Sequence, residues 1–453
     1  MAWSYLGHAM WLLEVAGLRV LFDPLLDVAH HGGVFEVWPR RRVRAERLRA
    51  DFVVVSHRHP DHFDVASLRQ LAALDRDTVL LCSDELVAWA AKEVGFRAVR
   101  VIGAGHLVEL QGARIFTTPS ATDVAEWGIM VEAGGALAWN QVDSVLRGAD
   151  DVRRVRAAAA RLLGTSREQR PQLVMARWQP LLEVAAVLGE QTSFPLEAYR
   201  AILEACAATD ARVIVPASAG VRHAASYAAM NRAAYPLAEG RFLRDVAARV
   251  PAAQAMPAIL GARYRVSGDG VECEARGAVD LIEPVEGCAA DDRIFRPFEL
   301  PPVVDPNPAS AGMREVVARW IEQALAPALA DRYPEMGVAR ALLLVVEVVF
   351  SDGSDGYSLE VSGAGTRVSR ALDPDYDALN VIAGSLLRDV IEGRRHWGDP
   401  LLAGMYRASL RAYEVGERGI SAARLAPTFL YYALSYDESF RRALTWELRK
   451  PAP

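Results

Sequence analysis

Short apolar runs alternate with turn residues through the first third of the chain. Each run is bounded by Gly, Asp or Pro, which is typical of β-strands; examples are WLLEVAG, LRVLFDP, DFVVVSH, TVLLCS and ARIFTTPS. Two other segments, VASLRQLAALD and DELVAWAAKEVG, repeat their apolar residues at intervals of three and four, which predicts helices. The pattern therefore predicts an α/β fold.

The same alternation continues beyond residue 145. We expect helices at DDVRRVRAAAARLLG and PLEAYRAILEACAATD, and strands at QLVMARWQP and ARVIVPASAG. This order suggests a further layer that packs onto the same sheet. Residues 1–295 are therefore expected to form one domain.

A change of composition follows at RPFELPPVVDPNPASAGM, where several prolines stand between two periodic segments. Proline at this density disfavours helices and central strands, so residues 296–309 are interpreted as a linker. Beyond it an amphipathic helix, a hairpin-like strand pair and a mainly helical remainder are expected. Residues 310–453 would then form a smaller α+β domain.

Length and charge narrow the classes of protein. A chain of 453 residues is too long for one ordinary core, which also favours two domains. The net charge of −6 disfavours nonspecific binding to nucleic acid. No stretch approaches the roughly 18 apolar residues of a membrane span, and the start lacks a basic region with a cleavage site. We expect a cytoplasmic protein with no nucleic-acid or membrane partner.

The stretch SHRHPDHFD places three histidines and an aspartate within six residues, directly after an apolar strand. Residues two apart in extended backbone point the same way, so His57 and His59 can share one metal ion. Asp61 and His62 would project to the other side and hold a second ion. Imidazole nitrogen and carboxylate oxygen suit zinc, iron or manganese. The turn therefore predicts a dinuclear metal site.

With this turn the sequence resembles the metallo-β-lactamase superfamily over most of residues 1–240. YLGHAMWLLEVAGLRVLFDP is similar to the opening hairpin of its lactonase-like branch, and it places His8 and Asp23 near the site. WNQVDS places Asp143 where the family has a carboxylate that bridges both metals. The resemblance implies an αββα sandwich with the metals at one edge, followed here by the second, smaller domain.

Two histidines of the family pattern are missing or displaced. After the strand IFTTPSATD the chain offers Asp123, with Glu126 as a competing candidate for the third ligand of the first metal. At the end of ARVIVPASAG it has Ser218, and His223 would have to fold back to serve. The resemblance thus implies one metal held by His57, His59 and Asp123 or Glu126, and another held by Asp61, His62 and Asp143, with His223 as a further candidate.

Two histidines with one carboxylate form a ligand set that suits ferrous iron and dioxygen. Within the superfamily the chain looks most like the branch of CMP-N-acetylneuraminate hydroxylase and the diiron hydroxylases of antibiotic pathways. The leading hypothesis is a non-haem iron oxygenase that holds two iron ions and oxidises a small molecule in a biosynthetic pathway. Because the chain has no Rieske motif, an external electron donor or the substrate would supply electrons.

Two alternatives remain open. The first is a dinuclear zinc or manganese hydrolase of the lactonase or phosphodiesterase type, in which Asp61 or Asp143 orients the attacking water. The second is a catalytically degenerate metal-binding scaffold, in which the lost histidines record lost catalysis. Metal content distinguishes the three hypotheses.

Other features are candidates for substrate binding. His30 and His31 lie in a glycine-containing loop expected at the metal edge, where they could bind substrate, donate a proton or be solvated. The arginines at positions 40–44 could bind a carboxylate or phosphate, although a solvated face is also expected. The last domain resembles a sterol-carrier module, which could cap the site or hold an apolar part of the substrate, or could serve only packing or homodimer formation.

Overall fold

The computed structural model describes residues 1–122, 124–166, 169–190, 193–285, 293–296, 300–416 and 419–450. Contacts divide the chain into two compact units. The larger unit comprises the described residues of 1–181 and 194–296, and the smaller comprises those of 182–193 and 297–450. One segment departs from the expected boundary: α4 (Glu183–Val187) packs against α11 (Gly398–Leu402) and β25 (Tyr406–Leu410) of the smaller unit.

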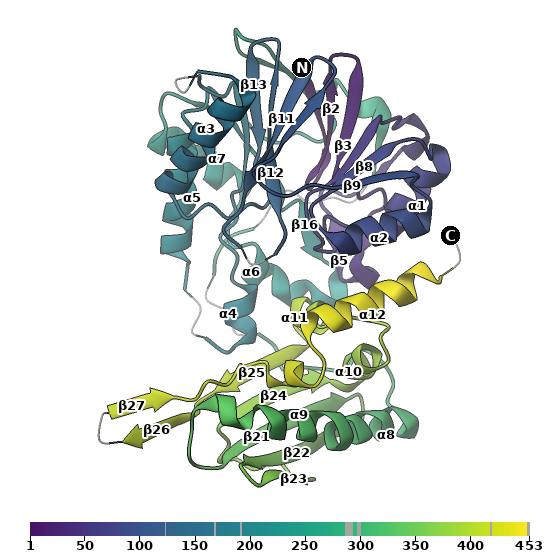
Figure 1. Cartoon of the computed structure of the whole chain (residues 1–453), viewed down its shortest axis with the longest axis vertical. Helices are drawn as coiled ribbons and strands as arrows, with labels where there is room; N and C mark the ends of the chain where they lie inside the picture. Colours follow the sequence, from purple (N-terminus) through teal and green to yellow (C-terminus); the bar gives the residue numbers. More distant parts are fainter. Residues whose placement is uncertain are drawn as a thin grey trace. The chain divides into compact units, whose positions relative to one another are not determined.

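Within its described residues, the larger unit is built on two sheets. The first has eight strands in the order β19 (Val271–Glu274), β18 (Arg263–Val266), β1 (Ala2–Gly7), β2 (Met10–Val15), β3 (Leu18–Phe22), β7 (Phe52–Val55), β8 (Val79–Cys82) and β9 (Ala98–Val101). The second has seven strands in the order β10 (Leu107–Leu110), β11 (Ala113–Pro119), β12 (Trp127–Ala133), β13 (Ala136–Asn140), β14 (Leu173–Ala176), β15 (Val213–Pro216) and β17 (Gln254–Ala255). Figure 1 shows the two sheets face to face.

The core of this unit lies between the sheets. Trp3, Tyr5 and Trp11 from the first sheet pack with Ile129 and Met175 from the second in one buried cluster. Alternate residues of β1 thus point inward, as the period of two in a strand requires. The apolar surface removed from water between the sheets is the main stabilising contribution to the unit.

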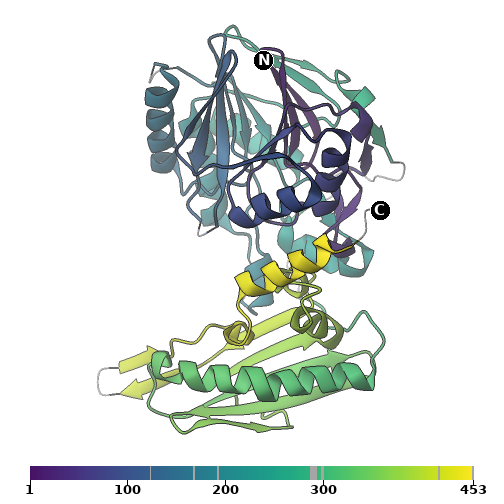
Figure 2. The ribbon, with the colours of Figure 1, turned by 45° about the vertical axis from the view of Figure 1, so that its right-hand side comes forward.

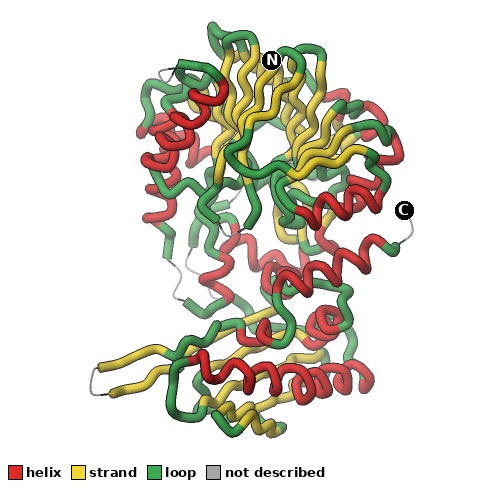
Figure 3. Tube along the Cα trace, in the orientation of Figure 1, coloured by secondary structure: helices red, strands yellow, loops and turns green. Residues whose placement is uncertain are grey.

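Helices cover the outer faces of both sheets, which completes the αββα sandwich that the sequence predicted (Figure 3). The first sheet is covered by α1 (Val65–Leu74) and α2 (Glu85–Val94). The second is covered by α3 (Ala149–Leu163), α5 (Leu196–Thr209) and α7 (Glu239–Arg249), with the short α6 (Asn231–Ala234) before α7. The fold class is therefore a metallo-β-lactamase sandwich of α/β type with an additional domain.

The connectivity brings several strand ends to one edge of the sandwich. Strands β3, β7 and β8 are parallel, and so are β13, β14 and β15. The carboxyl ends of parallel strands meet at the same edge of a sheet, which is where open α/β sheets place their ligands. Two small sheets also belong to this unit: β16 (Val221–His223), β5 (Phe35–Val37) and β4 (Ala29–His30) form one, and β20 (Ile282–Pro284) and β6 (Arg41–Val43) form the other.

The smaller unit is built on a five-stranded sheet (Figure 2). Its order is β23 (Gly365–Ser369), β22 (Gly353–Ser362), β21 (Leu342–Phe350), β24 (Ala378–Ala383) and β25. The expectation of a mainly helical remainder is wrong, because β24 and β25 complete the sheet and a hairpin of β26 (Tyr413–Gly416) and β27 (Gly419–Ala422) follows. The strand pair and the α+β class are as expected, and the likeness to a sterol carrier stays a prediction.

The helices of this unit follow the predicted amphipathic segment and then the later strands. Besides α4, they are α8 (Ala311–Trp320), a π-helical turn (Ile321–Leu325), α9 (Ala326–Arg332), α10 (Gly384–Ile391), α11 and α12 (Tyr436–Leu448). The π-helical turn ends two residues before Pro327, whose ring lacks an N–H and clashes with the carbonyl one turn earlier. Among the described residues, no helix has the length and apolar character needed to cross a membrane.

Candidate metal centre

The predicted metal turn follows β7 directly and ends at the start of α1. The backbone N–H groups of His62 and Phe63 both donate to the carbonyl oxygen of His59, at 2.9 and 2.8 Å. Asp64 then caps α1, since its side chain accepts a hydrogen bond from the Ser67 N–H at 2.7 Å. The second aspartate of the motif is therefore a helix cap that fixes the exit of the turn.

Asp23 anchors the turn from the end of β3. Its side chain is fully buried and accepts hydrogen bonds from the Ser56 N–H at 2.7 Å and from the Ser56 hydroxyl at 2.8 Å. The same carboxylate lies 2.9 Å from Nδ1 of His62. A carboxylate on Nδ1 of a histidine orients the ring so that Nε2 faces the site, as in many metal centres.

The Nε2 atom of His62 faces two further carboxylates. Asp143, which follows β13, places Oδ2 at 3.1 Å from it, and Asp61 places Oδ2 at 3.6 Å. Burial alone would lower the pKa of His62, but the charges of Asp61 and Asp143 raise it well above its ordinary value. Burial would likewise raise the pKa of Asp143, and the facing His62 instead lowers it. In the absence of a metal ion, the imidazolium of His62 and the two carboxylates therefore favour one another's ionised forms, and a bound cation would take the place of the imidazole proton.

His57 and His59 are neutral imidazoles, and His57 has a nitrogen available to a ligand. Burial lowers the pKa of both, and for His57 the neighbouring His62 lowers it further. His57 is fully buried, and its Nδ1 lies 2.9 Å from the Ser56 hydroxyl. Its Nε2 has no hydrogen-bond partner among the described residues. Metal binding requires a neutral imidazole of this kind.

Glu126 is the described candidate for the third ligand of the first metal. It precedes β12, is only 7% exposed, and its Oε1 has no hydrogen-bond partner in the described part of the chain. Burial, with a contribution from the charge of Asp143, raises the pKa of Glu126 to about 7. The competing candidate, Asp123, lies outside the described residues.

His8 enters the site from the turn between β1 and β2. Its ring is 1% exposed and packs edge-on against the ring of His62, with centroids 4.9 Å apart. Its Nε2 lies 3.4 Å from Oδ2 of Asp61. The expectation that His8 lies near the metal turn agrees with this position.

The other predicted histidines gather around Phe35 on the small sheet of β16, β5 and β4. Phe35 is paired directly with His30 on one side and with His223 on the other, and their rings lie 5.7 and 4.6 Å from its own. The ring of His31 lies 5.5 Å from that of Phe35. Burial lowers the pKa of His30 to about 3, so it is neutral.

His223 is not brought into either of the two groups of potential ligands that include residues of the metal turn. Those groups are His57, His62 and Asp143, and His8, Asp61 and His62, each with ligand atoms within 4.8 Å of one another. The backbone N–H of His223 donates instead to Oδ1 of Asn231 at 2.8 Å. Its place in β16, opposite Phe35, separates it from the expected position at the end of β15.

Several non-glycine residues at this edge adopt left-handed backbone conformations. They are His8, Asp23, Val142, Ser218 and Ala219, with φ between 41° and 56°. Such a conformation is unusual, most of all for a β-branched residue such as Val142. Sparsely populated backbone of this kind persists only where the surroundings over-determine it, and it clusters at functional sites.

Arg41 stabilises the loops at the same edge through hydrogen bonds to their backbone. It is fully buried and donates to the carbonyl oxygens of Leu6 at 2.7 Å, Leu25 at 2.6 Å and Asp27 at 3.0 Å. Burial lowers its pKa to about 10. The expectation of a solvated face is wrong for Arg41, because its guanidinium ties the end of β1 to the loop after Asp23. Arg40 is bound to Glu36 at 2.7 Å.

The residues of this edge fit a metal ion. Unpartnered buried atoms are costly unless a ligand satisfies them, and His57 Nε2 and Glu126 Oε1 are such atoms among the described residues. Imidazole and carboxylate together form the donor set that zinc, iron and manganese accept. Among the described residues near the turn, the ligand atoms that lie within 4.8 Å of one another are those of His57, His62 and Asp143 and those of His8, Asp61 and His62. The predicted grouping of His57 with His59 and Glu126 stays a prediction.

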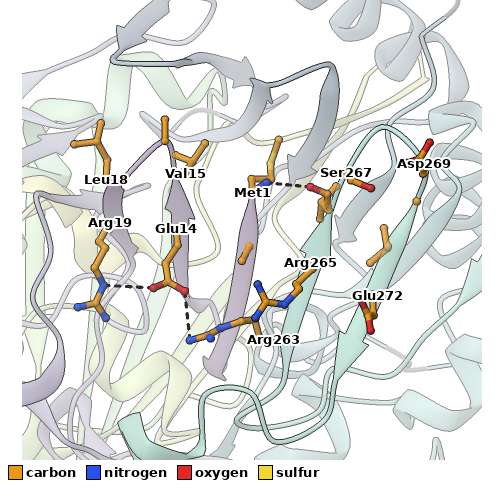
Figure 4. Close-up of a pocket in the computed structure, with 16 residues that line it drawn as sticks. Met1, Glu14, Val15, Leu18, Arg19, Arg263, Arg265, Ser267, Asp269 and Glu272 are labelled. Carbon is orange, nitrogen blue, oxygen red and sulfur yellow. Dashed lines mark hydrogen bonds and ion pairs between the residues drawn. The ribbon is translucent and has the colours of Figure 1, made fainter.

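A cavity of about 1010 Å³ lies at the other end of the first sheet (Figure 4). It is lined by Glu14 at the end of β2 and Arg19 at the start of β3, whereas His8 precedes β2 and Asp23 follows β3. Glu14 pairs with Arg19 at 3.9 Å and with Arg263 at 3.3 Å. Glu14 is thus paired with an arginine on each side.

Sequence reasoning found the turn and several of its neighbours but missed three supports. The roles of Ser56 and Asp64 depend on hydrogen bonds that have no separate sequence signal, apart from the capping preference of aspartate before a helix. The burial of Arg41 ran against its neighbours, which are charged and partly exposed. A buried arginine can be recognised in a sequence when apolar residues flank it. The groups that surround Arg41 come from distant parts of the chain, so its burial had no such signal.

Comparisons with known proteins find a family match over the part of the chain that contains the metal turn. The sequence model of a family described as the beta-lactamase superfamily domain matches residues 3–145. A curated UPF0173 metal-dependent hydrolase from Aeropyrum pernix is 31% identical over 150 residues, which cover 29% of this chain and 57% of that protein. Similar relatives from Carboxydothermus hydrogenoformans and Methanopyrus kandleri are matched over 26% and 52% of their lengths. The chain thus spans about half or less of the length of these relatives.

Two solved structures are matched at low sequence identity and low TM-score. Isothiocyanate hydrolase from Delia radicum gut bacteria is 17% identical, with a TM-score of 0.40 over 59% of this chain and 100% of that chain. CmlA, a diiron beta-hydroxylase from Streptomyces venezuelae, is 16% identical, with a TM-score of 0.35 over 48% of this chain and 45% of that chain. The family match thus covers residues 3–145, which include the metal turn, and this part of the chain is similar to the beta-lactamase superfamily domain.

Proposed function

We propose that the chain is a metal-dependent hydrolase with two metal positions at the edge where β3, β7 and β13 end. The observation that carries the proposal is the pair of unpartnered buried atoms, His57 Nε2 and Glu126 Oε1, beside a second group of ligand type. Curated relatives described as metal-dependent hydrolases support the same reaction class. The iron oxygenase that the sequence favoured becomes the second candidate.

The substrate class is an ester, such as a lactone or a phosphodiester. When bound, a metal ion would polarise the scissile carbonyl or phosphoryl group and make water a nucleophile near neutral pH. Asp61 and Asp143 are 27% and 29% exposed, so their carboxylates can reach a water molecule at the site. In hydrolysis the water adds to the ester carbon or phosphorus, its proton passes to Asp61, and the leaving oxygen takes up a proton as its bond breaks.

One observation favours the second candidate, an oxidation by dioxygen. Glu126 would supply a carboxylate where a third imidazole is typical of the superfamily, and two histidines with one carboxylate suit ferrous iron. That reaction would need electrons from an external donor or from the substrate.

The two candidates are separated by loading the full chain with zinc, manganese or ferrous iron. Ester cleavage is followed on a lactone and a phosphodiester, and oxygen uptake is followed with an electrode. We expect metal-dependent ester cleavage that is lost in His57→Ala, with no oxygen uptake beyond that of free iron. Oxygen uptake that requires the iron-loaded protein, with no ester cleavage, would favour the oxygenase. Protein that retains no metal would contradict both.

A further inference from the structure

We propose that His8 is a positioning residue that donates a hydrogen bond from Nε2 to Asp61, and that it is not a metal ligand. This inference rests on the proposed metal site. The two roles are easily confused, because the ligand atoms of His8, Asp61 and His62 lie within 4.8 Å of one another. The hydrogen bond to the other nitrogen of His8 shows which of the two roles, donor or metal ligand, the residue can have.

The Nδ1 atom of His8 accepts a hydrogen bond from the backbone N–H of Gly220 at 3.1 Å. A backbone N–H can only donate, so Nδ1 must carry a lone pair. A neutral imidazole has one N–H, which must then be on Nε2. A metal ligand needs the lone pair of Nε2, so His8 could bind metal through Nε2 only if the bond to Gly220 were broken.

The chain is shaped to make this bond. A Cβ at position 220 would lie 2.6 Å from the backbone N and Cα of His8, so only glycine allows the approach. Ser218 and Ala219, both left-handed at φ 56° and 51°, turn the chain back after β15 to bring Gly220 there. His8 itself is left-handed at φ 53°, which turns its ring towards His62.

The Nε2–H of His8 faces the site. It lies 3.4 Å from Oδ2 of Asp61, and it makes no complete hydrogen bond within the described part of the chain, although His8 is 1% exposed. A buried donor at this place is satisfied once Asp61 moves a few tenths of an ångström. The same oxygen of Asp61 lies 3.6 Å from Nε2 of His62, so a hydrogen bond from His8 would fix the orientation of this carboxylate beside the second metal position.

Two variants distinguish a donor from a ligand. In His8→Phe both nitrogens are lost. In His8→Gln the amide can accept from Gly220 through its oxygen and donate to Asp61 through its nitrogen. We expect both variants to bind as much zinc per chain as the wild type. His8→Phe should lower kcat about tenfold or more, in the range known for residues that orient metal ligands, with KM little changed, and His8→Gln should recover part of the loss.

A nitrogen-15 NMR spectrum of the zinc-loaded wild type provides a readout that needs neither a variant nor a substrate. The Nε2–H tautomer of His8 is expected, and the signal is assigned by its loss in His8→Gln. Loss of one zinc equivalent in either variant, or an Nδ1–H tautomer, would overturn the proposal. Wild-type protein that binds no zinc would instead contradict the proposed function, while the tautomer in the zinc-free protein would still decide the role of the Gly220 bond.

Discussion

The two ends of the β2–β3 hairpin carry carboxylates in opposite circumstances. Asp23, at the end of β3, is fully buried and binds Ser56 and His62. Glu14, near the end of β2, is 37% exposed and pairs with Arg19 and Arg263. The same two strands thus present a buried, precisely bonded group to one edge and a solvated ion pair to the other. The functional edge is therefore recognised by two features. Its buried groups have fixed hydrogen-bond partners, and a few of its buried atoms have no partner in the described part of the chain. The size of a cavity does not identify it.

Removal of Asp23 should cause the largest loss in free energy of unfolding among the variants that compare the two ends. Asp23→Ala leaves the Ser56 hydroxyl and a charged His62 without their partner in a buried site, and breaking such a pair costs about 3–5 kcal/mol. Glu14→Ala is the matched control, and an exposed pair contributes about 1 kcal/mol or less. Urea denaturation monitored in the larger unit gives both free energies of unfolding. Equal losses would show that the two ends do not differ as described.

Glu126→Gln tests whether the functional edge includes this carboxylate. We expect the affinity for zinc at the first position to fall about tenfold or more, because an amide is a poorer ligand and a displaced group near the metal costs about 10-fold to 100-fold. Asp123→Asn is the comparison variant, and competition with a chelator measures both. A larger loss in Asp123→Asn would assign the third ligand to Asp123.

Gly220→Ala and Gly268→Ala compare two glycines of the larger unit. Neither glycine is left-handed, but a Cβ at Gly220 would meet the backbone of His8 at 2.6 Å, whereas nothing lies within 4 Å of a Cβ at Gly268. We expect Gly220→Ala to cost about 1–3 kcal/mol, as overpacked positions do, and Gly268→Ala to change stability by about 0.5 kcal/mol or less. Thermal unfolding of both variants provides the test.

Glu126 should also leave a smaller signature in the pH dependence of the metal-free protein. Its folded pKa of about 7 lies above the ordinary value of 4.5. Between these values the folded state binds the proton that the unfolded state has released, so this residue makes stability fall as pH rises from about 4.5 to about 7. The difference in free energy of unfolding between wild type and Glu126→Gln should shrink towards low pH. A constant difference would mean that Glu126 is not buried and unpaired.

The sequence predicted the parts of the fold that depend on local pattern. Alternating apolar runs located β2, β3, β7 and β11, and the helical spacing located α1 and α2, since both signals follow from one-sided burial. The metal turn was visible because its ligands are close in sequence. By contrast, the packing of α4 with the smaller unit and the strands β24 and β25 depend on partners far along the chain.

The candidate site was predictable to the same extent. One short motif contains His57, His59, Asp61 and His62, so these residues could be predicted from the local sequence. Asp143 could be predicted only from the resemblance to a known family. The hydrogen bonds of Ser56 to Asp23 and of Gly220 to His8 join residues 33 and 212 positions apart, and no local pattern encodes them. His223 looked plausible by its type and distance along the chain, but its pairing with Phe35 takes it elsewhere.

The central claim is that the turn after β7 holds two metal ions, and metal content tests it most directly. The full chain is purified after expression with zinc, iron and manganese, and elemental analysis is performed on the wild type, His57→Ala and Glu14→Gln as a control from the opposite end. The account predicts about two ions per chain in the wild type and in Glu14→Gln, and about one in His57→Ala. A wild type without metal, or equal metal content in His57→Ala, would contradict it.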